Sequence, residues 1–183
     1  MSDHIPLSVP LIDGNEWQYV KECLDTGWVS STGSYVTELE HSVTDYVGAK
    51  HAIACVNGTS ALHIALLLLG VGPGNEVIVP TATFVAPVNA VRYAGAEPVF
   101  MDCDEYYNLD AAKVTEFIMT QTRVEDGISF NVQTGRRIAA LMPVHVFGNA
   151  ADLRGLVGLC RDRGIRLLED ASESLGSWYR NPD

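Results

Sequence analysis

The stretch GIRLLEDASE, residues 164–173, decides the fold. Residues 165–168 are mostly apolar, follow a glycine and have the length of a short buried strand. Two carboxylates, Glu169 and Asp170, come directly after this segment. In an open α/β sheet, side chains just beyond the carboxyl end of a strand face the ligand crevice. The sequence therefore predicts that Asp170 lies in such a crevice, although an acidic residue there could also cap the next turn or bind a metal.

Upstream of this stretch, helical and strand patterns alternate from about residue 50 onward. Strands are expected at residues 51–56, 76–79, 97–101 and 165–168, with helices at 58–69, 83–93, 110–122 and 152–163. This alternation is typical of a parallel sheet with crossover helices. Two helices, 15–25 and 35–47, precede it. The helix at 58–69 is almost wholly apolar and is expected to be buried on all faces.

One part of the pattern allows two interpretations. Residues 128–132 and 136–140 flank a Gln-Thr-Gly turn and suggest a hairpin, but residues 141–147 could instead continue the second arm as a core strand. We find no repeat, no low-complexity tract and no linker that would mark a domain boundary.

Composition excludes some classes of function. The chain has 183 residues, enough for one domain with a sizeable core. A hydrophobic fraction of 47% is ordinary for a soluble globular protein. The net charge of −11 argues against nucleic acid and anionic membranes as partners. It does not exclude a small anionic ligand, because a helix N-terminus can favour an anion locally.

Cysteine usage and the N-terminus indicate a cytoplasmic protein. The four cysteines are widely spaced and form no C-x-x-C pair, so reduced, buried thiols are expected rather than disulfides or a metal site. The first ten residues have neither the basic nor the apolar region of a signal peptide. The longest apolar run, residues 61–71, is too short to span a membrane.

A second candidate site element is the sequence Asn-Gly-Thr-Ser at residues 57–60, which follows one predicted strand and opens a helix. Unpaired backbone N–H groups and the dipole make this a suitable place for a phosphate, and the hydroxyls of Thr59 and Ser60 could add donors. The alternative is ordinary helix capping by Asn57 or Thr59.

Two further residues occupy suggestive positions. Phe84 lies just after Pro80, at the start of a predicted helix, where an aromatic ring could belong to the core or to a ligand wall. His145 ends the segment before a crossover and could face the crevice or be structural.

Taken in chain order, these motifs resemble the DegT/StrS-type nucleotide-sugar aminotransferases, which are fold-type I enzymes dependent on pyridoxal phosphate (PLP). The resemblance covers nearly the whole chain and includes residues 26–31, 74–80, 95–100 and 108–110. It implies an α/β three-layer sandwich with a mostly parallel sheet. Residues 1–183 are expected to be the front part of the PLP-binding large domain, with the small C-terminal domain absent.

The resemblance also implies roles for individual residues. Thr59 and Ser60 would bind the cofactor phosphate, Phe84 would stack on its ring and Asp170 would contact its pyridine nitrogen. A carboxylate there keeps the nitrogen protonated, so that the ring acts as an electron sink. Glu173 stands where the family commonly has a glutamine near the phenolic oxygen. This glutamate is a departure, since a second carboxylate beside a phenolate needs a proton or a bridging donor.

The implied activity is transfer of an amino group from glutamate to a nucleotide-linked keto-sugar, for amino-sugar or surface-glycan biosynthesis. The insertion-like segment 123–137 points weakly to a 4-keto sugar. A homodimer is expected, with no nucleic acid or membrane as partner. The family's cofactor-binding lysine is expected beyond residue 183, since Lys21, Lys50 and Lys113 are the only lysines, so this chain alone is predicted to be inactive.

Other functions remain open at this point. The first is a PLP-dependent dehydratase or isomerase of the same fold, because some relatives replace the lysine. The second is a fragment that binds PLP weakly or only associates with a partner. A dinucleotide-binding dehydrogenase is disfavoured because no G-x-G-x-x-G follows the first predicted strand.

Overall fold

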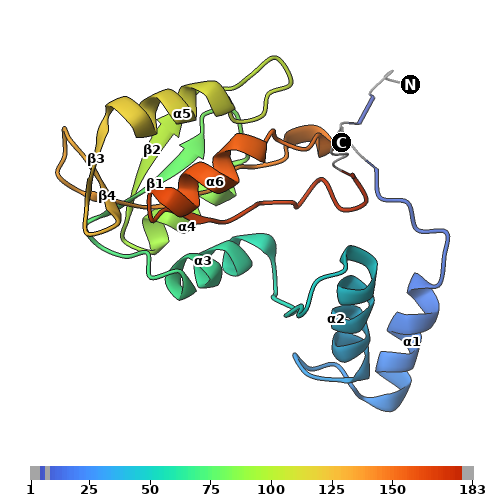
Figure 1. Ribbon diagram of the computed structural model, residues 1–183. Coiled ribbons are helices and arrows are strands. Elements are labelled where there is room, and N and C mark those ends of the chain that lie inside the picture. Colours follow the sequence, from blue (N-terminus) through green and yellow to red (C-terminus); the bar gives the residue numbers. More distant parts are fainter. Residues whose placement is uncertain (1–4, 7–8, 179–183) are drawn as a thin grey trace. The chain divides into compact units, whose positions relative to one another are not determined.

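The computed structural model describes residues 5–6 and 9–178 (Figure 1). The chain forms two units, an N-terminal unit Met1–Ala54 and a C-terminal unit Cys55–Asp183. Each unit is described by itself below.

The N-terminal unit contains two helices, α1 (Glu16–Thr26) and α2 (Ser34–Val47), close to their predicted positions. Both helices end at a glycine in the left-handed conformation, Gly27 with φ 74° and Gly48 with φ 67°. A side chain at either position would be strained, which explains why the chain stops its helices with glycine there. Neither helix has a buried residue.

Tyr35 of α2 contacts two residues of α1. Its hydroxyl donates a hydrogen bond of 2.7 Å to Oε2 of Glu22, and its ring meets that of Tyr19 edge-on at 5.1 Å. The hydrogen bond to the Glu22 carboxylate raises the pKa of Tyr35 to about 12. This polar and aromatic contact links α1 to α2 without forming an apolar core.

The C-terminal unit is built on a six-stranded sheet. Its strands are β1 (Asn75–Pro80), β2 (Glu97–Met101), β3 (Thr122–Glu125), β4 (Ile128–Asn131), β5 (Arg137–Leu141) and β6 (Arg166–Leu167). The order is β2-β1-β5-β4-β3, and β6 also pairs with β5. The pairs β1–β2, β1–β5 and β5–β6 are parallel, whereas β4 is antiparallel to β3 and β5. The predicted mostly parallel sheet is confirmed.

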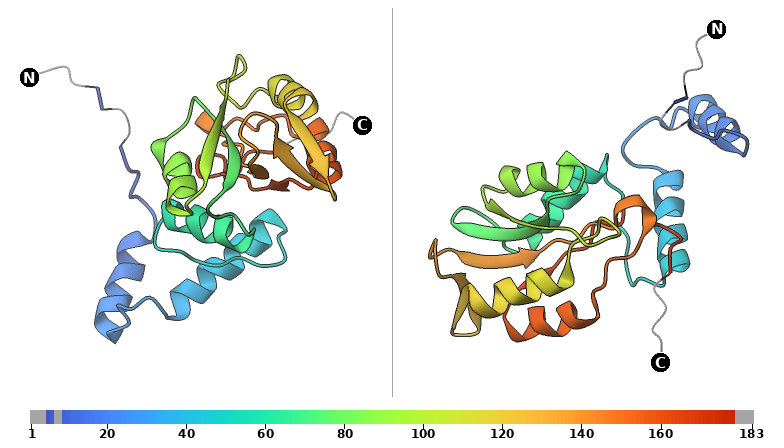
Figure 2. Two further views of the ribbon diagram at one scale, coloured as in Figure 1. Left: turned by 90° about the vertical axis from the view of Figure 1, so that its left-hand side faces the viewer. Right: turned by 90° about the horizontal axis from the view of Figure 1, so that it is seen from above.

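Helices cover both faces of this sheet, which confirms the three-layer α/β architecture (Figure 2). They are α3 (Gly58–Leu68), α4 (Val85–Tyr93), α5 (Ala111–Thr120) and α6 (Arg154–Asp162). On one face, α3 and α4 pack with Val79 of β1 in one buried apolar cluster. On the other, α5 and α6 pack with Ile78 in a second cluster. Because successive side chains of a strand point to opposite faces, neighbouring residues of β1 serve two cores.

The strand expected at residues 51–56 is wrong, because these residues form no strand in the structure. Val56 is 88% exposed, and Cys55, expected to be buried, is exposed as well. An apolar run becomes a strand only when another strand supplies its hydrogen-bond ladder. The described sheet places none beside this segment.

The sequence also missed β3, whose residues Thr-Arg-Val-Glu have little apolar character. This strand pairs along its length with β4 through a turn in which Asp126 and Gly127 have φ of 49° and 75°. The hairpin expected between residues 128–132 and 136–140 is reduced to one pair, Phe130 with Arg137. Residues 122–125 therefore form an edge strand because their backbone pairs with β4, and not because their side chains are hydrophobic.

Helix α3 is not buried on all faces, contrary to the prediction. Leu62 and Leu66 are buried, but Leu67 is 50% and Leu68 83% exposed. Its packing partners within the unit, α4 and the sheet, cover one side only. Among the helices of the described residues, none combines the length and apolar character needed to cross a membrane.

Candidate functional site

A pocket of about 840 Å³ lies in the C-terminal unit. It is lined by the first turn of α3 and by segments that follow the carboxyl ends of β1, β2, β5 and β6. Loops from the same ends of parallel strands meet at one edge of the sheet, which is where open α/β sheets bind ligands. The fold therefore gathers residues from five separate segments into one cavity.

Asp170 is fixed in this pocket by its backbone and by its side chain. Its residue is 7% exposed, and its backbone N–H donates to the Pro143 carbonyl at 3.0 Å. Carboxylate oxygen Oδ1 accepts from the Ser172 backbone N–H at 3.1 Å and from the Ser172 hydroxyl at 2.5 Å. Among the described residues, none donates a hydrogen bond to Oδ2. One oxygen is thus held by the turn, and the other remains for a ligand.

The first turn of α3 treats Thr59 and Ser60 differently. Asn57 Oδ1 accepts from the Ser60 backbone N–H at 2.8 Å, which confirms the capping interpretation for Asn57. Thr59 and Gly58 line the pocket, and neither backbone N–H has a partner among the described residues. Ser60 is not among the residues that line the pocket. An anion in this cavity would therefore meet Thr59 first.

Three aromatic rings line the same pocket. Phe84, the residue before α4, is 76% exposed and was singled out from the sequence. Tyr107 and Phe147 were missed, and their rings meet at right angles with centroids 5.9 Å apart. Hydropathy carries no signal for such residues, because exposed rings resemble any surface aromatic. Their places in the loops after β2 and β5 were the only available clue.

Glu173 lines the pocket through a contact with the neighbouring segment. Its Oε2 accepts a hydrogen bond from the Phe147 backbone N–H at 3.2 Å. This carboxylate therefore ties the turn after β6 to the turn after β5. The bond leaves its second oxygen for another donor.

His145 is engaged at both ring nitrogens. Its Nδ1 accepts from the Ala151 backbone N–H at 3.1 Å, so the ring proton of the neutral form resides on Nε2. Nε2 lies 3.1 Å from Oε2 of Glu169, and this hydrogen bond lowers the pKa of that carboxyl group. The residue is 6% exposed. These contacts assign His145 a structural role beside the pocket.

The remaining polar groups of the pocket define its electrostatics. The hydroxyl of Thr83, a lining residue, is buried without a partner among the described residues. The charged lining residues in the described part of the chain are Asp170 and Glu173, with no lysine or arginine among them. The described residues contain no group of three or more His, Cys, Asp and Glu side chains placed to hold a metal ion. The pocket suits a ligand that offers a hydrogen-bond donor to Asp170 and a flat apolar face.

The fold and this pocket define a class of protein. The chain belongs to the DegT/DnrJ/EryC1/StrS aminotransferase family, whose sequence model matches residues 10–182. The resemblance inferred from the sequence is thereby confirmed.

Individual relatives agree with this assignment. A GDP-perosamine synthase of Caulobacter vibrioides is 44% identical over 98% of this chain. A DegT/DnrJ/EryC1/StrS aminotransferase from Brucella abortus has a crystal structure with a TM-score of 0.76, at 34% identity over 87% of this chain and 40% of its own. NtdA from Bacillus subtilis, solved with its cofactor PMP bound, gives a TM-score of 0.74 at 27% identity, over 96% of this chain and 39% of its own. The chain spans 45% of the Caulobacter enzyme's length.

Proposed function

We propose that this chain forms the cofactor-binding part of a PLP-dependent aminotransferase that transfers an amino group from glutamate to a nucleotide-linked keto-sugar. The observation that carries the proposal is the Asp170 carboxylate, which is buried, held at one oxygen by Ser172 and open at the other. A related GDP-perosamine synthase supports a GDP-linked sugar as the acceptor. The PMP bound in NtdA supports the cofactor.

The residues present fit such a cofactor. Asp170 Oδ2 would accept from the protonated pyridine nitrogen, and Phe84 offers an exposed ring as a wall for the cofactor ring. The backbone N–H groups of Gly58 and Thr59 at the start of α3 suit the phosphate. Ser60 would contribute only through its hydroxyl, because its N–H is bonded to Asn57. The orphaned hydroxyl of Thr83 adds a further donor in the same cavity.

When bound, the cofactor supplies an electron-withdrawing ring that stabilises negative charge beside the transferred nitrogen. The chain's own contribution is to hold a negative charge at Asp170 where the ring nitrogen would lie. Ser172 donates two hydrogen bonds to that carboxylate and keeps it oriented. Glu173, bonded to the Phe147 N–H, would lie near the phenolic oxygen and requires a bridging proton there. The cofactor-binding lysine would come from outside the described lining of the pocket.

We infer a cytoplasmic homodimer for the whole protein. Large apolar side chains of the N-terminal unit support an association surface, since Trp17, Leu24 and Trp28 are each more than half exposed. Cys23, Cys103 and Cys160 are free thiols, which fits a reducing compartment.

Replacement of Asp170 by asparagine tests the proposed function in the intact protein. Asp170→Asn keeps a hydrogen-bonding group of similar shape but removes the charge that would keep the ring nitrogen protonated. We expect amino transfer from glutamate, followed in a single turnover by absorbance, to slow by at least about 100-fold, equivalent to about 2.7 kcal/mol. The affinity for PMP should fall by less than about tenfold.

Asp162→Asn, an exposed carboxylate at the end of α6, is the matched control and should change neither value. A rate for Asp170→Asn within about threefold of the wild type would refute the electron-sink role. Release of a dehydrated sugar in place of an amino sugar would identify a dehydratase and overturn the aminotransferase.

A further inference from the structure

Two of the aromatic residues of the pocket have an unusual backbone. Among the described non-glycine residues, only Tyr107, Asp126 and Phe147 have a positive φ, at 65°, 49° and 55°. This left-handed conformation is unfavourable for residues with a Cβ and persists only where the surrounding structure fixes it. Asp126 lies in the tight turn between β3 and β4. Tyr107 and Phe147 lie in the pocket and touch each other.

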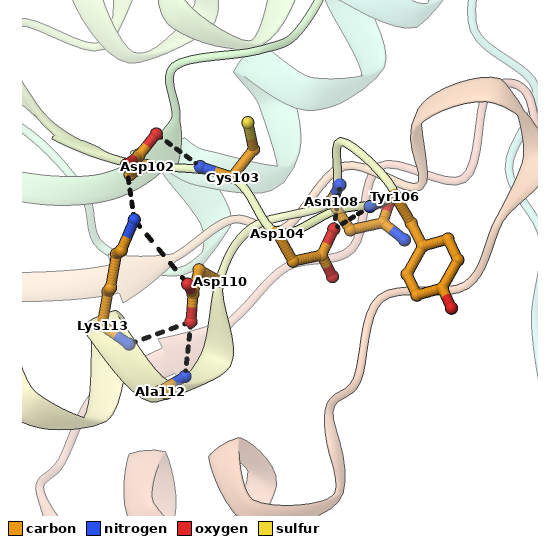
Figure 3. Close-up of polar contacts among 8 residues, drawn as sticks. All are labelled: Asp102, Cys103, Asp104, Tyr106, Asn108, Asp110, Ala112 and Lys113. Atoms are coloured by element: carbon orange, nitrogen blue, oxygen red, sulfur yellow. Dashed lines mark hydrogen bonds and ion pairs between the residues drawn. The ribbon is translucent and has the colours of Figure 1, made fainter.

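The loop between β2 and α5 fixes Tyr107 from both sides, through hydrogen bonds to its two neighbours. Figure 3 shows these bonds at Tyr106 and Asn108. Oδ1 of Asp104 accepts from the backbone N–H of Tyr106 at 2.8 Å and from that of Asn108 at 3.0 Å. The Asp104 N–H donates to the Asn108 carbonyl at 2.8 Å, and Tyr107 N–H donates to the Asp104 carbonyl at 3.2 Å. An isolated antiparallel β-bridge between the backbones of Cys103 and Leu109 closes the base of the loop. Tyr107 is therefore held at the tip of a closed, hydrogen-bonded loop.

Phe147 is held by a separate set of contacts. Its N–H donates to Glu173, and the carbonyl of the next residue, Gly148, accepts from the Ser177 hydroxyl at 2.7 Å. Two strained positions from two different loops thus place their rings against each other. Neither ring is buried by this arrangement, since Tyr107 is 57% and Phe147 71% exposed. Packing within the chain does not compensate the strain, which indicates that the rings are positioned for a ligand.

We propose that the Tyr107–Phe147 pair is the substrate wall of this pocket and packs against the sugar ring of the nucleotide-linked substrate. The inference rests on the proposed function, because the sugar ketone must reach the transferred amino group in this same cavity. The volume of about 840 Å³ lies in the upper part of the usual range of about 300–1,000 Å³ for ligand pockets, which leaves room for substrate beside a cofactor.

Charge distinguishes the sugar from the rest of the substrate. The charged groups among the described lining residues are the carboxylates of Asp170 and Glu173. A diphosphate at the Tyr107–Phe147 pair would meet no lysine or arginine among the described lining residues, and the backbone N–H groups that suit a phosphate lie elsewhere, at the start of α3. An uncharged sugar ring can present C–H groups to the aromatic faces and leave its hydroxyls to the polar side of the cavity. The wall is therefore assigned to the sugar, and the diphosphate is expected to lie away from it.

Calorimetric titration of the intact, PMP-loaded protein tests this assignment with two ligands, GDP-mannose and GDP. Tyr107→Gly removes the ring while glycine keeps the left-handed backbone. It should bind GDP-mannose about tenfold more weakly, and GDP within about twofold of the wild type. Tyr107→Phe, which keeps the ring, should bind both ligands within about twofold. Asp126→Gly is the matched control. It relieves the same kind of backbone strain in the turn between β3 and β4, outside the pocket lining, and should change the affinity for neither ligand.

Equal weakening for GDP-mannose and GDP would show that the wall contacts the nucleotide and would overturn the assignment to the sugar. Unchanged binding of both ligands by folded Tyr107→Gly would overturn the wall itself. If melting curves show that this variant does not fold, Phe147→Gly replaces it, with the same expected outcomes. A wild type that binds GDP-mannose but transfers no amino group from glutamate to a GDP-linked keto-sugar would instead refute the proposed function.

Discussion

The two units of this chain use apolar side chains in opposite ways. The C-terminal unit buries two clusters, one on each face of its sheet, and residues such as Ile78 and Leu66 are completely inaccessible. The N-terminal unit contains two well-formed helices without a buried residue, and Leu24 and Trp17 are 62% and 72% exposed. An amphipathic helix pattern predicts a helix, but burial requires a second surface. Only the C-terminal unit supplies such surfaces within the described chain.

Hydrogen exchange should reveal the largest difference between the two units. Amides of β1 and β5 lie in the buried sheet and should exchange only through global or near-global unfolding. In the 183-residue chain, diluted until it is a monomer, amides of α1 and α2 should exchange at least about a thousandfold faster, because neither a core nor a partner chain opposes local opening. Mass spectrometry of exchanged peptides measures both. Equal protection in the two units would mean that another surface covers Trp17 and Leu24.

Two glycine-to-alanine substitutions, one in each unit, should differ in their effect on the free energy of unfolding. Gly164 has φ +62°, and a Cβ there would clash with the backbone oxygen of Gly127. Gly164→Ala should therefore lower the free energy of unfolding by at least about 3 kcal/mol, through backbone strain and a clash that no side chain can relieve. Gly48 has φ +67° with no atom within 4 Å of an added Cβ. Gly48→Ala should cost only about 1 kcal/mol.

Urea denaturation with a separate probe in each unit measures both variants. A Gly164→Ala protein as stable as Gly48→Ala would show that the turn between β3 and β4 moves freely away from α6. The expected difference in stability between substitutions in the packed C-terminal unit and in the unpacked N-terminal unit would then be absent at Gly164.

The smallest expected effect concerns ion pairs. The hydrogen bond from His145 lowers the pKa of Glu169, so the ionised carboxylate stabilises the fold above its ordinary pKa of 4.5. This stabilisation is lost as the pH falls below 4.5 through the folded-state pKa. Glu169→Gln should therefore be slightly less stable than the wild type at pH 7, and this deficit should shrink as the pH falls below 4.5 toward pH 3. Asp25→Asn, which breaks the exposed pair with Lys21, should differ from the wild type at neither pH.

Thermal melts at the two pH values distinguish these cases. A stability deficit of Glu169→Gln that persists unchanged at pH 3 would mean that the carboxylate acts through its shape and not through its charge.

Where the sequence predicted the fold well, local signals coincided with tertiary packing. The helix predicted at residues 110–122 carries its own cap, since Asp110 Oδ1 accepts from the N–H groups of Ala112 and Lys113. The strand at residues 97–101 is confirmed at both ends. Where prediction failed, the outcome depended on whether a neighbouring strand pairs with the segment. Residues 51–56 look like a strand but have no ladder, whereas the polar residues of β3 form one because β4 lies beside them.

The candidate site follows the same division. Phe84, Asp170 and Glu173 stand next to strand ends in the sequence, and all three line the pocket, although their roles toward a cofactor stay predictions. Ser60 was grouped with Thr59 because the two are adjacent, but its N–H is bonded to Asn57. Tyr107 and Phe147 could not be found from the sequence, because their contact joins residues 40 positions apart.

The sequence by itself determined the family, the α/β class and the helices that carry their own start and stop signals, since these depend on residues close together in the chain. The tertiary structure alone decided which apolar segments are buried, which strands pair and which aromatic rings meet in the pocket. These outcomes depend on free energies of contact between distant segments, which no local pattern contains. A strand needs a partner for its hydrogen bonds, and a left-handed Tyr107 needs Asp104 and its closed loop to hold it.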